Sequence, residues 1–300
     1  MTGTLLVILA CLLWGMDTLI RYPLVDRGIH PVTIVFLEHC FLTLIFSTGL
    51  ITQIKRIGEL KLVDLFSFLI IGGFGSAIAT VAFTESFQYL NPSLVILLQK
   101  LQPIVAIVLA SLVLNEEIKK EFIIWTVVCL IGGLLVSSPD IERFYHLMVS
   151  NMGTVTSDFA LKGYGLVAVS IIGWGATTVF GKRLSLAGFE PKTIMGGRFL
   201  TGLLVLIPFV QWNRSLILPN GEDYLKILIM VIISGALAMW FYYQGLKRLP
   251  AKTTAIAEMF FPFFAIIVNW IFLGKQLTEL QLLGGAILIF GSLVIQLKKY

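Results

Sequence analysis

Several ionisable side chains lie inside long apolar runs of this 300-residue sequence. A charge at the centre of a membrane helix costs about 2.5–3.5 kcal/mol even on mild scales, so such residues usually bind a ligand or transfer protons. The candidates are Glu38, His39, Glu85, Lys100, Arg198 and Glu258. A lysine or arginine there can hold a substrate carboxylate, and a glutamate can hold an ammonium group or carry a proton.

The sequence contains none of the common catalytic or metal-binding patterns. No Walker loop, G-x-S-x-G, H-E-x-x-H or paired C-x-x-C occurs. We therefore expect no catalytic residue, no metal and no cofactor, and we do not expect an enzyme.

The elements that position these charges follow from composition. The chain is 57% hydrophobic and 13% charged, whereas a soluble domain carries about 25% charged residues. Lipid permits only helices or closed barrels, and barrel strands would alternate polar and apolar residues. These runs are apolar all round, so we expect an all-α integral membrane protein. The net charge of +5 comes from basic residues beside the runs, which indicates membrane topology and no nucleic-acid partner.

Ten apolar stretches have about the length of 20 residues that a membrane span requires. They lie at roughly 3–22, 31–53, 66–88, 93–114, 121–138, 161–182, 191–212, 224–246, 252–273 and 280–297. We expect ten transmembrane helices, with residues 1–138 and 161–300 as two five-helix units. Residues 139–160 form the loop between them.

The two units are an internal duplication. Shifts of 158 to 160 residues align Trp14-Gly15 with Trp174-Gly175, Pro31 with Pro191, Pro103 with Pro262, and Gly133 with Gly291. Five helices is an odd number, so the copies must enter the membrane upside down relative to each other. Inverted repeats are characteristic of transporters. Lysine and arginine gather on the side of the N-terminus, which places both termini in the cytoplasm of an inner or plasma membrane.

Lys100 and Glu258 are the sharpest pair of candidates, because their helices are repeat partners. Glu258, Pro262, Ala265 and Asn269 form one helical stripe, and Gln99, Pro103, Ala106 and Ala110 form the matching stripe. Both stripes are expected to face the pseudosymmetry axis. Either Lys100, with Arg198, receives a substrate carboxylate while Glu258 holds an ammonium group, or Lys100 and Glu258 neutralise each other as a structural ion pair.

The other candidates also have two interpretations. Glu38 or Glu258 can carry the proton of a coupled antiporter and His39 can relay it, or His39 is a hydrogen-bonded histidine of the bundle. Asp17 and Arg21 are four residues apart on one helix, which favours an internal pair. Trp14 and Trp174 precede mid-helix glycines and are either packing residues or part of the substrate site.

The order of these motifs resembles the EamA branch of the drug/metabolite transporter superfamily. The resemblance rests on Trp-Gly in the first helix of each half, on a proline that opens helix two, and on VILLQKLQPIVAIVLASLVLNEE (95–117) with its second copy TTAIAEMFFPFFAIIVNWIFLGKQLT (253–278). It implies a pseudosymmetric transporter with a central cavity that works by alternating access. Two positions depart from that pattern: Glu38 lies where an arginine is common, and Gly274-Lys275 replaces an acidic residue.

We therefore expect a secondary active transporter of a small polar or zwitterionic metabolite, with an amino acid favoured. A proton-coupled exporter of organic cations or drugs is the alternative, and a membrane-embedded lipid-handling protein is a further one. Small residues such as Gly72, Ser76 and Thr80 form a face for close helix contact, within the monomer or in a homodimer.

Overall fold

The computed structural model describes residues 3–53, 58, 60–115, 117–142, 155–212, 219–246, 248–249, 257–258 and 260–298. Among these residues the only regular elements are helices. Their bounds are α1 (Gly3–Met16), α2 (Thr18–Asp26), α3 (Pro31–Thr52), α5 (Leu62–Phe68), η1 (Leu69–Ile78), α6 (Ala79–Ser86), α7 (Pro92–Leu98), η2 (Gln99–Leu101), α8 (Gln102–Leu114), α9 (Lys120–Val136), α11 (Val155–Leu186), α12 (Pro191–Trp212), α13 (Gly221–Met230), η3 (Val231–Leu237), α14 (Ala238–Leu246), α16 (Phe260–Leu273) and α17 (Glu279–Lys298).

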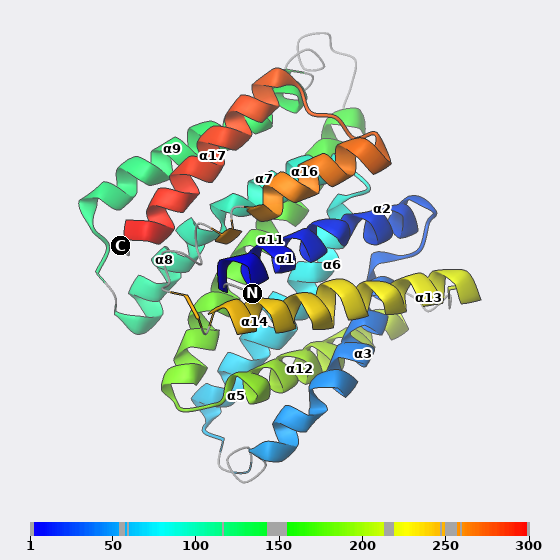
Figure 1. Ribbon diagram of the computed structural model, residues 1–300, viewed down its shortest axis with the longest axis vertical. Coiled ribbons are helices and arrows are strands. Elements are labelled where there is room, and N and C mark those ends of the chain that lie inside the picture. The colour runs from blue at the N-terminus through cyan, green and yellow to red at the C-terminus, as the bar shows by residue number, and fades with distance from the viewer. Residues whose placement is uncertain are drawn as a thin grey trace.

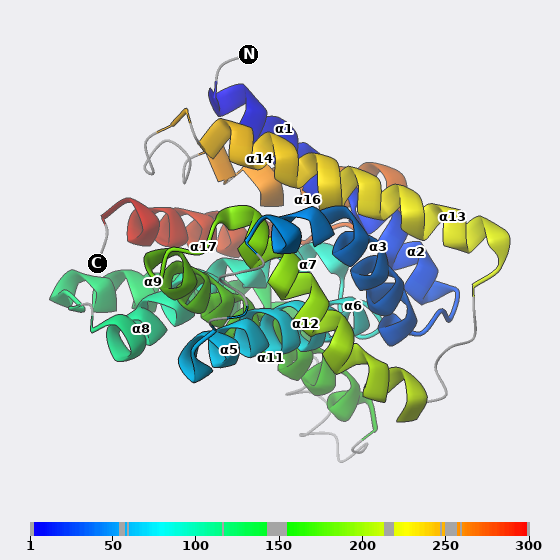
Figure 2. The same ribbon diagram turned by 90° about the horizontal axis from the view of Figure 1, so that it is seen from below.

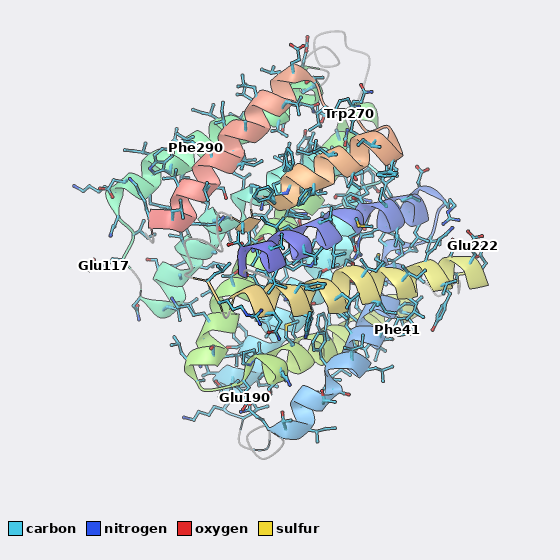
Figure 3. All side chains as sticks on the ribbon, viewed as in Figure 1. Phe41, Glu117, Glu190, Glu222, Trp270 and Phe290 are labelled. Atoms are coloured by element: carbon cyan, nitrogen blue, oxygen red, sulfur yellow. The ribbon has the colours of Figure 1, made fainter. Side chains whose placement is uncertain are left out.

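The helices of this chain have the length and apolarity of membrane spans. In the described residues, 8 stretches qualify, and α16 is a shorter apolar helix. The helix α9, with 17 residues, is slightly shorter than the stretches that qualify as spans. Large apolar side chains such as Trp270 and Phe290 are exposed on the outside of the bundle (Figure 3). Lipid is the solvent that accommodates such a surface, so the chain is a multi-pass membrane protein.

Helices from the two halves of the chain pack against each other. The helix α1 lies between α14 and α16 (Figure 1). In turn, α11 packs against η1, α6 and α8, while α3 packs against α12 and α9 against α17. Seen from below, α1, α13 and α14 lie on one side of the molecule, and α5 and α11 lie on the other (Figure 2).

Glycines at two equivalent places allow these helices to approach closely. A Cβ on Gly15 of α1 would lie 3.1 Å from the backbone nitrogen of Ala265 in α16. A Cβ on Gly175 of α11 would lie 3.3 Å from the backbone nitrogen of Ala106 in α8. Both contacts join a helix from one half of the chain to a helix from the other half.

Two of the long helices contain a π-helical segment, η1 and η3. Such segments widen the helix by one residue per turn and occur frequently at functional sites. In η1, glycines face the neighbouring helices so closely that a side chain there would collide with them. A Cβ on Gly75 would lie 1.8 Å from the Thr177 hydroxyl oxygen of α11.

We expect Gly72→Ala to destabilise the protein by about 1–3 kcal/mol, because the new methyl group overpacks a dry helix interface. The Cβ would lie 1.8 Å from Oγ1 of Thr201 and 2.3 Å from the Arg198 carbonyl oxygen, and a backbone atom cannot rotate away. The matched control is Gly165→Ala on α11, where nothing lies within 4 Å. Thermal unfolding in detergent should show a lower midpoint for Gly72→Ala alone. Equal midpoints for the two variants would contradict this packing.

Candidate functional site

Lys100 lies in a short break between α7 and α8, and the following proline explains the break. Pro103 has no backbone N–H to donate to the carbonyl of Gln99 four residues earlier. That carbonyl instead accepts from the N–H of Gln102, which tightens residues Gln99–Leu101 into a 3₁₀ turn. The expected stripe through Gln99 and Pro103 is therefore not a continuous α-helical face. The break turns the Lys100 side chain toward α16, where its Nζ lies 5.4 Å from the centre of the Phe261 ring.

Glu258 lies close to Lys100 but is held by another group. Its Oε1 accepts a hydrogen bond of 2.6 Å from the hydroxyl of Tyr242 in α14. The Tyr242 ring lies 5.3 Å from the ring of Trp14 in α1, so three elements meet here. Glu258 acts on Lys100 through its charge, but no direct ion pair joins the two in the part of the chain that the structure describes. The direct form of the structural ion pair is therefore absent.

Gln99 adds an unusual feature beside Lys100. Its side chain is buried, and its amide Nε2 has no acceptor within the described ranges. A buried donor without a partner costs about 1–3 kcal/mol, so its presence calls for an explanation. The nearby amide of Gln102 is held differently and lies 3.5 Å from Oγ1 of Thr178 in α11.

A second charged cluster surrounds Arg21, which is only 3% exposed. Its Nε donates to Asp17 at 2.6 Å, which confirms the internal pair predicted from the spacing on α1 and α2. Its Nη1 and Nη2 both donate to Glu38 of α3 at 3.1 Å, and Nη1 also reaches the Thr84 hydroxyl of α6 at 3.2 Å. Ser234 of η3 donates to Asp17 at 2.7 Å. The Arg21 guanidinium therefore joins three membrane helices, and Asp17 links them to a fourth through Ser234.

Arg198 and His39 are the residues expected to act with Glu38. Both lie nearby, but the hydrogen bonds to Glu38 come from Arg21. Arg198 acts on Glu38 through its charge, and its guanidinium carbon lies 5.7 Å from the centre of the Phe199 ring. The ring of His39 is buried, with Nδ1 2.8 Å from the carbonyl oxygen of Val35 and Nε2 3.1 Å from the Ser76 hydroxyl. The hydrogen-bonded histidine is thus the arrangement observed.

The candidates therefore divide into two groups. Lys100, Glu258, Gln99 and Trp14 lie around the junction of α1, α14, α16 and η2. Glu38 belongs to the cluster around Arg21, whereas His39 and Arg198 lie beside it with contacts of their own. Trp174 lies in neither group, because its ring packs 5.2 Å from Phe83 in the core. Glu85 pairs with Lys162 at 3.0 Å, near the end of α6.

Asn269 connects α16 to two other helices, α2 and α7, through buried hydrogen bonds. Asn269 is fully buried and accepts from the Thr18 hydroxyl at 2.6 Å, while its amide donates to the Ser93 hydroxyl at 3.1 Å. Pro262, Ala265 and Asn269 all lie on the buried face of α16, as their spacing predicts. No residue of α8 is fully buried, so the matching stripe through Ala106 is only partly covered.

A hollow of about 160 Å³ opens beside the second group. Its wall is mostly apolar, with Asp17 and Ser234 as the polar groups, and it is formed by Met16, Asp17, Leu19, Ile20, Met230, Ile233 and Ser234. The described residues hold no cluster of histidine, cysteine, aspartate or glutamate suited to a metal ion.

Comparison with known proteins adds the family. The model of the EamA-like transporter family matches residues 1–138 and 161–297. The chain is 30% identical to the riboflavin transporter ImpX of Fusobacterium nucleatum, over 98% of this chain and 97% of that protein. It is 23% identical to the uncharacterized transporter YetK of Bacillus subtilis, over 79% of this chain and 69% of that one.

A solved crystal structure shares the fold, with a TM-score of 0.58 and 16% identity over 98% of this chain and 96% of that chain. The match of the family model over most of the sequence, on a bundle of apolar helices that encloses charged residues, shows that this chain belongs to the EamA-like transporter family.

Proposed function

We propose that this chain is a secondary active transporter with ten membrane spans in two inverted five-helix repeats, 1–138 and 161–300. Four repeated features support the two related units, and the odd number of helices in each unit supports their inversion. Under the sequence shift of about 160 residues, the contact of α1 with α14 becomes that of α11 with η1 and α6. The contact of α1 with α16 likewise becomes that of α11 with α8. The π segments η1 and η3 occupy equivalent positions, and Gly28 and Gly188 have φ of 86° and 87°.

The proposed substrate site is the junction that contains Lys100 and Glu258. The observation that carries it is the separation of the two charges: Lys100 faces the Phe261 ring, and Glu258 is held by Tyr242. A structural ion pair would have closed this gap. Gln99 adds a buried donor with no acceptor among the described residues. An incoming polar molecule can satisfy all three groups.

The surroundings favour a substrate with a planar ring. Trp14, Tyr242 and Phe261 place three aromatic side chains around the two charges, and aromatic rings stack on planar ligands. The name of the relative ImpX supplies a molecule of this kind. Riboflavin combines a flat ring system, whose edge carries donors and acceptors, with a chain of hydroxyl groups. It is our first candidate, with Lys100 and Gln99 donating to the ring edge and Glu258 accepting from hydroxyl groups.

A zwitterionic amino acid is the second candidate. The opposite charges of Lys100 and Glu258 favour it, because its carboxylate and ammonium group can each meet a counter-charge. An organic cation or drug would need Glu258 but not Lys100, so Lys100→Ala distinguishes that alternative by sparing transport.

The test is uptake into proteoliposomes that contain the purified protein. Labelled riboflavin and a panel of labelled amino acids are offered separately, with protein-free vesicles as the control. Saturable uptake of riboflavin, with unlabelled amino acids failing to compete, supports the first candidate. Saturable uptake of an amino acid, with unlabelled riboflavin failing to compete, supports the second candidate. Uptake of neither class would refute both substrates.

Coupling to protons is proposed to involve Glu38, with His39 next to it in the sequence and buried. Pro103 and Pro262 are proposed to loosen the two repeat-related helices during the cycle. The proposed location is the inner or plasma membrane, with both termini in the cytoplasm. A homodimer is also proposed.

We expect Glu38→Gln to abolish the dependence of uptake on an imposed pH gradient, because an amide side chain neither binds nor releases a proton near neutral pH. Uptake by Glu38→Gln that still follows the gradient would contradict this assignment.

A further inference from the structure

Two ion pairs join helices from different halves of the chain, and neither belongs to the clusters described above. Arg27, at the end of α2, contacts Asp223 of α13 at 2.6 Å, as an ion pair without the alignment of a hydrogen bond. Arg183, in the last turn of α11, donates from Nη1 to Asp64 of α5 at 3.3 Å and to the Ser67 hydroxyl at 2.7 Å. Each pair therefore fastens a first helix of one half to a third helix of the other.

The two pairs lie at opposite ends of the bundle. From Arg27 the chain returns through the long helix α3 before α5 begins, so Asp64 lies across the membrane span from Arg27. From Arg183 the chain crosses through α12 before α13 begins, so Asp223 lies across the span from Arg183. The start of α13 and the labelled Glu222 lie at the right of the view, and α5 lies at the lower left (Figures 1 and 3).

The local structure of the two pairs is repeated. Asp64 and Asp223 differ by 159 positions, the offset of the duplication, and each lies buried in the first turn of its helix. The arginines do not correspond in this way, because Ala187 is the residue equivalent to Arg27, and Arg183 lies one turn before it. The aspartate thus occupies the equivalent position in both halves, whereas the arginine that pairs with it comes from a position one helical turn away. The same contact has formed at both ends from different sequences.

The exposure of their arginines separates these pairs from the Arg21 cluster. The arginine side chains are 42% and 24% exposed, whereas that of Arg21 is 4% exposed. The partner aspartates are 8% and 10% exposed and lie in the first turn of a helix, where the N–H groups favour a carboxylate. Water can solvate each arginine when its pair opens, so breaking the pair costs little more than for an exposed ion pair, about 0.2–1 kcal/mol. Such a contact can therefore break and re-form within a cycle. The Arg21 cluster cannot open without stranding buried charges.

We propose that Arg27–Asp223 and Arg183–Asp64 are the two gates of the transport cycle, each holding one end of the central site shut and opening in turn. This inference rests on the proposed alternating access. In the structure both pairs are formed, so these helices are joined at both ends. Opening either end requires its first and third helices to separate, and the ion pair there is the contact that must break.

The test measures the opening of each end separately, by distances between spin labels on the whole protein in nanodiscs. Cys11, Cys40 and Cys129 are first replaced by alanine. One label pair, Asp26→Cys with Gly221→Cys, reports on the Arg27 end. The other, Leu62→Cys with Ser185→Cys, reports on the Arg183 end. All four positions are exposed.

We expect Asp223→Asn to raise the population of the longer distance at the Arg27 end about two- to fivefold, with no lengthening at the other end. Asp64→Asn should do the reverse, and Arg27→Gln and Arg183→Gln should reproduce the effect of their partners. The matched control is Glu222→Gln, which removes the adjacent carboxylate of α13. That carboxylate pairs with Lys226 on its own helix, so both distances should stay as in the parent.

The inference is overturned if the Asn variants leave both distances unchanged, or lengthen both ends together. Thermal midpoints of all variants near that of the parent confirm that each is folded. Uptake by the unmutated protein separates this inference from the proposed function. End-specific opening without uptake of riboflavin or amino acids refutes the substrates alone, whereas uptake without end-specific opening refutes the gates alone.

Discussion

Arg21→Met is expected to lower the free energy of unfolding by about 3–5 kcal/mol, the cost of removing one partner from a buried group of charges. Arg21 is 3% exposed and donates to Asp17, Glu38 and Thr84. Without the guanidinium, two carboxylates whose side chains are 14% exposed lose their counter-charge. Unfolding in mixed micelles with increasing SDS measures the change.

Two companion variants make the result specific. Lys226→Met breaks the exposed pair with Glu222 on α13 and should change stability by no more than about 0.5 kcal/mol. Adding Asp17→Asn and Glu38→Gln to Arg21→Met should recover most of the loss, because neutral amides need no cation. If Arg21→Met unfolds at the same SDS concentration as Lys226→Met, the cluster does not hold α2, α3 and α6 together.

Much of the fold can be predicted from the sequence because lipid leaves the backbone few choices. The stretch 93–114, with Pro103 inside it, predicts one membrane helix, and the structure has helix from Pro92 to Leu114 with a 3₁₀ turn at the proline. The turn depends on which N–H replaces the missing one at the Gln99 carbonyl, and hydropathy does not encode that choice. The π segment in 69–78 is hidden for the same reason, since its apolar residues fit an α-helix equally well.

The site is less accessible to sequence reasoning, because contacts between helices depend on their rotation and depth. The spacing of four residues predicts the Asp17–Arg21 pair, and the structure has it. Glu38 and Arg198 occupy equivalent positions in the two halves of the sequence. The hydrogen bonds to Glu38 nevertheless come from Arg21 of the same half. The sequence pattern does not single out Tyr242 as a site residue, yet its hydroxyl donates a hydrogen bond to Glu258. A tyrosine in an apolar run needs a partner for its hydroxyl, and this is the signal that could have identified it.

The separation of Lys100 from Glu258 also changes what a mutation of either residue tests. In a closed ion pair, removing one charge mainly destabilises the protein and says little about a ligand. Here Glu258 keeps the hydrogen bond from Tyr242 when Lys100 is absent, and Lys100 is not anchored by Glu258 directly. The two variants are therefore expected to fold, so that their effect on substrate binding can be measured.

Lys100→Ala is expected to weaken substrate binding about 30-fold or more while the protein stays folded. The loss of one charged hydrogen-bonding group inside a dry site costs about 2–5 kcal/mol of binding free energy. Thermal stabilisation of the purified protein by riboflavin and by a panel of amino acids measures the effect, and Glu258→Ala is measured beside it. The stabilising ligand of the unmutated protein should lose its shift in both variants. Lys162→Ala, which removes an exposed lysine near the end of the bundle, should retain it.

Two results would contradict this assignment, and they point in different directions. If Lys100→Ala and Glu258→Ala are both unstable, and replacing both charges together by apolar residues restores the midpoint, the two charges stabilise the bundle and the substrate binds elsewhere. If Lys100→Ala keeps the full shift and only Glu258→Ala loses it, the site takes a cation, and Lys100 serves as a counter-ion to Glu258. Because Phe261 and Tyr242 hold the two charges apart, we expect neither result.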